Sequence, residues 1–278
     1  MRSATGIRPR VLRLIRGQVR CEVRGAALRH PGTPARAALL AHYSDQPQVT
    51  RSFRRLVAEL HDAGYTVAVM SSATCRSPLD WGGDLPGGVT VLRKPNVGYD
   101  FGSWTAAMAA LPTLTSAGRV IVANDSLVGP FASIDHLIGA YERSAADVWG
   151  LTETRQFFPH LQSYFLGFSG GVLRDRCLSD FWRNVRQEAT KTDVIWRNEL
   201  GLARLLRFEG FSVDAAYVND DVVAPGSNPT IIGWEKLLVS GFPFVKREIV
   251  VNPDVAPRGQ QVAVRVSERF GERLSDWI

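Results

Sequence analysis

From about residue 37 onward, short apolar runs alternate with stretches in which apolar residues recur at helical spacing. Apolar runs of this length predict strands, and the periodic stretches predict helices. Strands are expected at 37–43, 65–70, 89–92, 119–123 and 148–151, and helices at 49–63, 101–111 and 133–143. This alternation is typical of an α/β fold, in which a mostly parallel sheet carries helices on both faces. We expect a ligand site at the carboxyl ends of the strands.

The pattern changes after Phe157. An aromatic run precedes two amphipathic helical stretches, at about 175–189 and 195–208, and an irregular C-terminal extension follows them. We therefore divide the chain into a basic N-terminal arm (1–36), an α/β domain (37–253) and a C-terminal tail (254–278).

Basic charge is concentrated in the arm, which holds nine arginines and one acid, Glu22. The arm carries a formal charge of +8, and the rest of the chain carries −2. A nucleic-acid-binding domain would carry its basic groups on the folded surface. We therefore expect no nucleic-acid partner.

If residues 9–29 formed one helix, its arginines and its apolar residues would lie on opposite sides. The arginines are Arg13, Arg16, Arg20 and Arg24, and the apolar residues are Val11, Leu14, Ile15 and Val19. This pattern predicts a helix on an anionic membrane surface. Because Gly17 and Gly25 weaken the helix, a disordered or weakly helical leader is the alternative; an arginine-rich transit peptide is a lesser one.

The spacing of the cysteines and the hydropathy of the chain indicate its cellular compartment. Cys21, Cys75 and Cys177 lie far apart, which argues against a zinc site or a disulfide framework. No apolar stretch approaches the roughly eighteen residues of a membrane span, and arginines interrupt any signal-peptide core. We expect a cytoplasmic protein, with peripheral contact at the inner face of the plasma membrane through residues 1–36.

A glycine-rich segment follows the third predicted strand. In the sequence from Lys94 to Gly102, Gly98 and Gly102 would allow the backbone to approach a diphosphate or a sugar. Asn96 and Asp100 could hydrogen-bond a sugar or a base, and Ser44 follows the first strand at the same edge. We assign Ser44, Asn96, Gly98 and Asp100 to the donor. The alternative for this segment is a turn in which Asp100 caps the next helix.

The strand at 119–123 ends in Asn124, Asp125 and Ser126. Oxygen ligands at this position could hold Mg²⁺ or Mn²⁺ against the phosphates of a donor. We assign Asp125 and Ser126 to the metal and Asn124 to the donor. The alternative is an Asx turn that closes the strand. Asp220 and Asp221 could add a carboxylate, although a solvated turn is the stronger interpretation.

Glu199 lies near the start of an amphipathic helix, where the helix dipole favours a carboxylate. It is also the right residue type for a general base that deprotonates an acceptor hydroxyl. Gly170 and Gly171 would form a loop beside the site, or a hairpin turn. Trp104, Trp182 and Trp234 could stack on sugars, although most of the seven tryptophans are expected in the core. We assign Gly170, Gly171, Trp182 and Trp234 to the acceptor.

The order of these segments resembles that of family 2 glycosyltransferases with the GT-A fold. Their acid at the start of a leucine-rich helix matches Glu199 when counted back from Gly210. A closer resemblance is to the rhamnan synthesis protein F family, over about 37–253. It is carried by the segments 96–102, 124–130, 164–171 with Phe181-Trp182, 228–230, 234–238 and 241–246.

The resemblance implies a metal-assisted, inverting glycosyltransferase of cell-surface polysaccharide assembly. The implied donor is a nucleotide sugar such as dTDP-rhamnose, and the acceptor is a glycan or a lipid-linked glycan. In this chain Asn-Asp-Ser stands where that fold family has Asp-x-Asp, so two alternatives remain. One is a non-catalytic relative that binds nucleotide sugars or glycans, and the other is a nucleotide-sugar-modifying enzyme.

Overall fold

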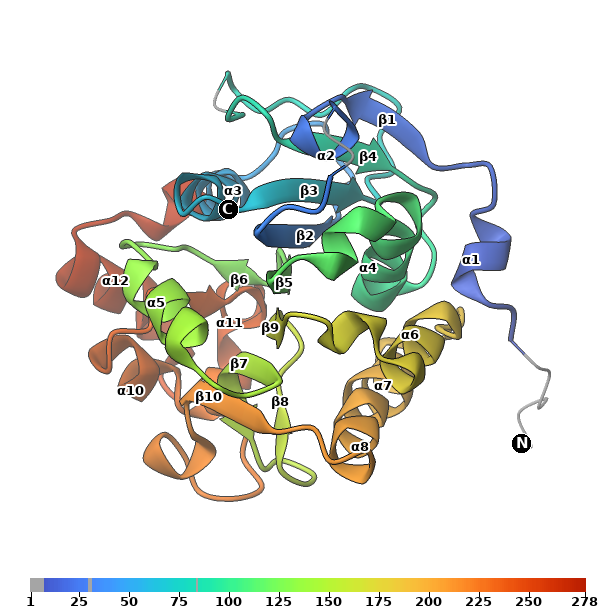
Figure 1. Cartoon of the computed structure of the whole chain (residues 1–278). Helices are drawn as coiled ribbons and strands as arrows, with labels where there is room; N and C mark the ends of the chain where they lie inside the picture. The colour runs from blue at the N-terminus through green and yellow to red at the C-terminus, as the bar shows by residue number, and fades with distance from the viewer. Residues whose placement is uncertain (1–7, 30–31, 84) are drawn as a thin grey trace, which may run out of the picture.

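The computed structural model describes residues 8–29, 32–83 and 85–278. Within them, a nine-stranded sheet has the order β1-β4-β3-β2-β5-β9-β7-β10, and β8 pairs with β7 (Figure 1). Its strands are β1 (Arg20–Val23), β2 (Arg36–His42), β3 (Thr66–Ser71), β4 (Thr90–Arg93), β5 (Arg119–Asn124), β7 (Val148–Thr154), β8 (His160–Leu161), β9 (Phe165–Ser169) and β10 (Val213–Tyr217). The strands predicted from apolar runs are all present, so this part of the prediction is confirmed.

The sheet is mixed, with a parallel centre. β4, β3, β2 and β5 run parallel to one another, as do β7 and β10, whereas β9 is antiparallel to both of its neighbours. The carboxyl ends of the four central strands therefore share one edge. His42, Ser71, Arg93 and Asn124 are the last residues of these strands.

Helices cover both faces of the sheet (Figure 1). The face with α3 (Arg51–Asp62) and α5 (Asp135–Arg143) buries Phe53, Leu56 and Leu137. The opposite face carries α4 (Tyr99–Ala110), α6 (Arg176–Arg183), α7 (Lys191–Val194) and α8 (Leu200–Phe208). Alternate residues of a strand point to opposite faces, so each strand contributes to both cores. The α/β class with helices on both faces is confirmed.

The N-terminal segment is not one helix. It contains α1 (Val11–Leu14), then β1, which pairs antiparallel with β4, and then α2 (Ala26–Arg29). Val11 and Ile15 are buried in the main core, and the backbone N of Val11 donates to Val185 O at 2.9 Å. The prediction of a continuous helix over 9–29 is wrong. The separation of arginines from apolar residues is real, because the arginines are exposed, but Val11 and Ile15 pack against the rest of the protein.

The C-terminal region is helical and packed, where an irregular extension was expected. It contains α9 (Pro229–Ile232), α10 (Trp234–Val239), α11 (Arg247–Val251) and α12 (Val262–Phe270). Beside them, β11 (Val245–Lys246) pairs antiparallel with β6 (Leu127–Val128). Residues beyond 253 belong to this unit, because Trp277 is 2% exposed and its carbonyl accepts a hydrogen bond from Ser52 Oγ at 2.6 Å.

Within the part of the chain that the structure describes, no helix has the length and apolarity that a membrane crossing requires.

Candidate active site

Two carboxylates meet where β5 ends and α4 begins. Asn124 closes β5, and its Nδ2 donates to Oδ2 of Asp100, in the first turn of α4, at 2.7 Å. Burial and the charge of Asp125 raise the pKa of Asp100 to about 6, against the hydrogen bond from Asn124. Burial also raises the pKa of Asp125, although the backbone N of Tyr43 donates to its Oδ2 at 2.9 Å. Two neighbouring carboxylates favour the binding of a cation, although Lys246 near Asp100 and Arg247 near Asp125 already offset part of their charge.

The pairing of β6 with β11 brings a lysine to the same place. Nζ of Lys246 lies 3.4 Å from Oγ of Ser126 and 4.6 Å from the ring centre of Tyr164. Burial lowers the pKa of Lys246 to about 8, while the charges of Glu199 and Asp100 act in the opposite direction. Lys246 is therefore mostly an ammonium at neutral pH, and its charge is held close to carboxylates from two different elements.

Glu199 ends the π-helical turn η3 (Ile195–Glu199) that joins α7 to α8. Its Oε2 accepts hydrogen bonds from the backbone N of Ser163, at 2.8 Å, and from the Ser163 hydroxyl. Nε2 of His160 lies 3.6 Å from its Oε1, and Nδ1 of that histidine lies 2.7 Å from Phe158 O. Burial by itself would raise the pKa of Glu199, but His160 and Ser163 stabilise the carboxylate and lower it.

These groups form one cluster, although the residues are far apart in sequence. Asp125 raises the pKa of Asp100, and Lys246 interacts electrostatically with both Asp100 and Glu199. Glu199 keeps 18% of its side chain exposed. The structure thus brings an acid pair, a buried ammonium and an ionised glutamate together.

The oxygen donors of this cluster fit a small divalent cation. The described residues contain no group of three or more His, Cys, Asp or Glu side chains that could hold a metal. Mg²⁺ commonly uses only one or two carboxylates, with substrate phosphates and water as its other ligands, and Asp100 and Asp125 provide two. Ser126 Oγ is a further oxygen beside them. Oδ1 of Asn124 is already engaged by the backbone N of Ser126, at 3.1 Å, and by its hydroxyl.

A groove of about 820 Å³ opens at the carboxyl ends of β3 and β4. Thr74, Lys94 and Asn96 line one side of it, and the N-terminal segment from Gly17 to Glu22 lines the other. The predicted donor residue Ser44 is close by, since its carbonyl accepts a hydrogen bond from the backbone N of Thr74 at 2.9 Å. The N-terminal segment, which the sequence suggested was a separate arm, forms part of this groove.

Gly98 and Gly102 do not face an open ligand site. Gly98 has a φ of +84° and is the N-cap of α4, a role predicted as an alternative for Asp100. A Cβ on Gly98 would clash with Cγ2 of Val11. A Cβ on Gly102 would lie 2.7 Å from Val97 O, in the loop before α4, and 3.3 Å from Cγ1 of Val11. The two glycines therefore make room for α1 and for that loop, where we had expected a phosphate or a sugar.

Gly170 and Gly171 lie at the opposite end of the sheet from the acid pair. β9 is antiparallel to β5, so Ser169 pairs with Arg119 at the start of β5. A Cβ on Gly170 would lie 3.2 Å from Gly118 O, which precedes that start. The structure does not bring this loop to the cluster, because sequence order alone does not show in which direction β9 runs.

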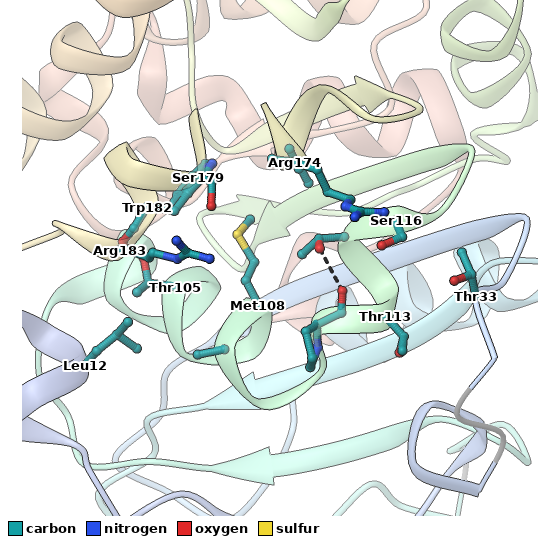
Figure 2. A pocket seen from close by; sticks show the side chains of 14 residues that line it. Leu12, Thr33, Thr105, Met108, Thr113, Ser116, Arg174, Ser179, Trp182 and Arg183 are labelled. Carbon is teal, nitrogen blue, oxygen red and sulfur yellow. Dashed lines mark hydrogen bonds between the residues drawn. The ribbon is translucent and has the colours of Figure 1, made fainter. Parts of the chain in front are cut away.

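Two tryptophans assigned to the acceptor are core residues. Trp182 is 3% exposed and stacks on Phe101, with ring centroids 5.6 Å apart. It also borders the groove in Figure 2, of about 670 Å³. That groove includes Thr113 and Ser116, which precede β5, so it lies at the amino end of the parallel strands. Trp234 is 2% exposed, and its Nε1 donates to Pro257 O at 2.9 Å.

Trp104 and Asp220 also have structural roles. Trp104 is fully buried, and its Nε1 donates to Ala123 O at 3.0 Å. Oδ2 of Asp220 pairs with Nη1 of Arg155 at 2.6 Å. Neither contact involves the cluster of Asp100, Asp125, Glu199 and Lys246.

Sequence reasoning missed the groups that surround the acids. Lys246, Ser163, His160 and Tyr164 received no role, although Lys246 ends the Gly-Phe-Pro-Phe-Val-Lys string that carried the resemblance. That string could have indicated a role for Lys246, because a lysine that follows an apolar strand is close to the core, and a buried charge needs a partner of opposite charge. Ser163 and His160 gave no comparable signal, since their role depends on the position of Glu199.

Comparisons with known proteins bear on this cluster. The model of a protein family described as rhamnan synthesis protein F matches residues 89–274. An uncharacterised protein of Sinorhizobium fredii, y4gN, is 29% identical over 143 residues, which are 50% of this chain and 37% of that protein. The virulence protein VirA of Vibrio anguillarum is 25% identical over 191 residues, 57% of this chain and 61% of VirA. The chain thus covers less than two thirds of either relative.

Proposed function

Because the chain belongs to the rhamnan synthesis protein F family, we propose that it is a glycosyltransferase of polysaccharide biosynthesis. The proposed donor is a nucleotide diphosphate sugar, with dTDP-rhamnose as the first to test. The proposed acceptor is a glycan or a lipid-linked glycan. The matched residues include Asp100, Asp125, Glu199 and Lys246, so the whole candidate cluster lies in the part that the family shares.

The observation that carries the proposal is the state of Glu199. A general base must be ionised and must be accessible to the hydroxyl that it deprotonates. Hydrogen bonds from Ser163 and His160 lower the pKa of Glu199, and its side chain remains partly exposed. Its charge interacts with Lys246, which also interacts with Asp100. A base is thus held close to an acid pair suited to a diphosphate and its cation.

The proposed reaction is a single inverting displacement. The acceptor oxygen forms a bond to the anomeric carbon as the bond from that carbon to the nucleoside diphosphate breaks. Glu199 takes the acceptor proton, and Lys246 lies where its ammonium can offset charge that grows on the leaving phosphate. When bound, Mg²⁺ or Mn²⁺ would add positive charge there, held by the carboxylates of Asp100 and Asp125 with Ser126 beside them.

We place the nucleoside of the donor in the 820 Å³ groove, beside Ser44, Thr74 and Asn96. The groove opens at the carboxyl ends of β3 and β4, on the same edge of the sheet as the end of β5, which leads to the acid pair; β2 lies between β3 and β5. The diphosphate would then extend toward Asp100 and Asp125, and the sugar toward Glu199.

The test is donor hydrolysis and sugar transfer by the purified chain with dTDP-rhamnose and Mn²⁺ or Mg²⁺. Glu199→Gln is expected to lower kcat by about 10²-fold or more with little change in donor binding, because general base catalysis contributes about 10²–10⁴-fold. Asp125→Asn is expected to weaken metal-dependent donor binding and turnover together.

Glu209→Gln is the matched control for the glutamate, since Glu209 is an exposed acid just after α8. Asp62→Asn is the control for the aspartate, since 78% of its side chain is exposed. Equal activity in the parent and in all four variants would remove the catalytic assignment. A parent that binds the donor without turnover would be a non-catalytic relative. Turnover of a sugar phosphate with a nucleoside triphosphate, without a glycan, would identify a nucleotide-sugar-modifying enzyme.

A further inference from the structure

An exposed pair of aromatic rings lies beside Glu199. Phe157, in the loop between β7 and β8, is 48% exposed, and Trp196, in η3, is 44% exposed. Their ring centroids are 5.1 Å apart, with an interplanar angle of 47°. Removal of an exposed aromatic ring from water is favourable, because the gain grows with the apolar area that is covered. Two such rings that contact each other in solvent therefore form a surface that gains from being covered.

Two contacts join the segment that contains Phe157 to the segment that contains Trp196. One is the contact of the aromatic pair, and the other involves the proposed base. Phe157 contacts Trp196, and three residues further along each segment His160 contacts Glu199, with Nε2 3.6 Å from Oε1. Three residues span at most about 10 Å of extended chain and about 4.5 Å of helix. The rings are thus within the reach of one oligosaccharide whose hydroxyl is at Glu199. The ring of Phe158, the next residue after Phe157, lies 5.5 Å from that of His160.

The π-helical turn determines which side chains face outward. Single π-turns within α-helices are rare and are frequent at functional sites. Here the turn from Ile195 to Glu199 leaves Trp196 exposed and buries Asn198. Glu199, at its end, reaches Ser163 and His160. One local feature therefore presents the tryptophan to solvent and positions the carboxylate.

The chemistry of the pair favours a sugar. The faces of pyranose rings carry C–H groups, which pack on the negative face of an aromatic ring. A protein partner would need a buried interface of roughly 1,000 Å² or more. The two rings are flanked instead by the exposed polar residues Gln156 and Arg197.

We propose that Phe157 and Trp196 form the acceptor subsite, where they stack on the glycan whose terminal hydroxyl is presented to Glu199. This inference rests on the proposed glycosyltransferase function. It replaces the acceptor assignment of Trp182 and Trp234, which the structure places in the core.

The test uses the full chain with a rhamnan tetrasaccharide as acceptor probe and dTDP-rhamnose with Mn²⁺ as donor. The variants are Trp196→Ala, Phe157→Ala, and Trp196→Tyr, which keeps a ring at that position. Phe208→Ala is the matched control, because Phe208 is an 88% exposed aromatic residue at the end of α8. The readouts are acceptor KM, kcat, donor hydrolysis without acceptor, and direct calorimetric binding of the tetrasaccharide.

We expect each alanine variant to raise acceptor KM and tetrasaccharide Kd by about tenfold, the change that corresponds to about 1.4 kcal/mol. Donor hydrolysis is expected to stay at the parent level, which also shows that the variants are folded. Trp196→Tyr and Phe208→Ala are expected to remain within about twofold of the parent.

The outcomes separate the two ideas. Unchanged acceptor KM and Kd in both alanine variants would overturn the subsite and leave the proposed function intact. Loss of tetrasaccharide binding in these variants, with no donor hydrolysis even by the parent, would support the subsite and remove the proposed function. A parent that neither binds nor extends the tetrasaccharide would overturn the subsite.

Discussion

Charge balance among a few side chains sets the chemistry of the candidate site. Asp100 and Asp125 have raised pKa values, whereas the pKa of Glu199 is lowered. At Glu199 the hydrogen bonds from Ser163 and the interaction with His160 outweigh the effect of burial and lower the pKa. At Asp100 and Asp125 burial outweighs the hydrogen bonds that they accept, and at Asp100 the charge of Asp125 also raises the pKa. Environments that separate the pKa values of like groups are typical of sites where those groups have different tasks.

Lys246 is a cation that interacts with carboxylates of both kinds, Asp100 and Glu199. Replacement by Met would remove the ammonium that interacts with both Asp100 and Glu199. We expect Lys246→Met to lower kcat/KM for the donor by about 10²-fold, the usual effect of deleting one preorganised group that stabilises developing charge. Lys246→Arg should retain part of the activity. Donor hydrolysis and transfer rates check this.

The control for Lys246 is Lys236→Met, which removes an exposed lysine from α10. Circular dichroism establishes that the variants are folded. Parent-like kinetics in a folded Lys246→Met protein would show that the ammonium does not serve the reaction.

His42 gives a prediction about stability and pH. It is 4% exposed, and its Nδ1 lies 3.0 Å from Ser71 Oγ. Burial, with the charges of Arg93 and Arg247, lowers its pKa to about 4, against the opposing charge of Glu22. Between pH 6.5 and about 4 the unfolded state therefore binds the proton more strongly than the folded state, so stability falls as the pH falls.

The shift of His42 corresponds to about 3 kcal/mol of unfolding free energy. Denaturant unfolding of the parent and of His42→Gln, at pH 7.5 and pH 4.5, measures it. We expect the variant to lose less stability on acidification than the parent. His136→Gln, at an exposed histidine, serves as the control. Identical losses in the parent and in His42→Gln would contradict the prediction.

Among the elements, the contact between α1 and α4 explains Gly98, a glycine that sequence reasoning gave to a ligand. Gly98 has a φ of +84°, and its missing Cβ leaves room for Val11. Left-handed backbone costs a residue with a Cβ about 1–2 kcal/mol. Gly98→Ala adds a steric clash to this strain, so we expect it to destabilise the protein by more than Gly171→Ala.

Gly171 is the matched control, because it has a φ of +88° and a Cβ there would meet no atom within 4 Å. Adding Val11→Ala to Gly98→Ala should remove the clash and leave the strain, so the double variant should lose less than the sum of the single losses. Strict additivity in urea unfolding would show that α1 does not pack on Gly98 as described.

The molecule as a unit places its basic groups at the surface while it buries the apolar side of the N-terminal segment. Arg13, Arg16, Arg20 and Arg24 are exposed, whereas Val11 and Ile15 are in the core. A peripheral membrane contact would therefore be electrostatic, without insertion of these apolar residues. Basic groups near an anionic surface contribute about 1 kcal/mol each, and salt screens them.

Vesicle flotation tests this contact. The full chain is expected to float with vesicles that contain phosphatidylserine at low salt and to dissociate at about 1 M salt, where the Debye length is about 3 Å. Replacement of the four arginines by Gln should reduce the bound fraction at least tenfold. Binding that survives high salt would require insertion of apolar residues and would contradict the prediction, as would binding that the four substitutions leave unchanged.

The local pattern of the chain already determined much of the fold. Runs such as 119–123 and helices such as 133–143 were predicted correctly, because strand and helix periodicity depends on near neighbours in the sequence. The same patterns placed Asp125 and Asn124 at a strand end, and the parallel sheet then placed them at the ligand edge. The resemblance identified Glu199, and the structure brings it to the same cluster.

Only the tertiary structure decided which segments meet. The antiparallel direction of β9 moved Gly170 to the far end of the sheet, and the pairing of β6 with β11 brought Lys246 to the acids. The packing of α1 on α4 places Val11 against Gly98, where a Cβ would clash. Each of these contacts joins residues distant in sequence, and strand direction and the choice of packing partner depend on how the whole chain buries its apolar surface.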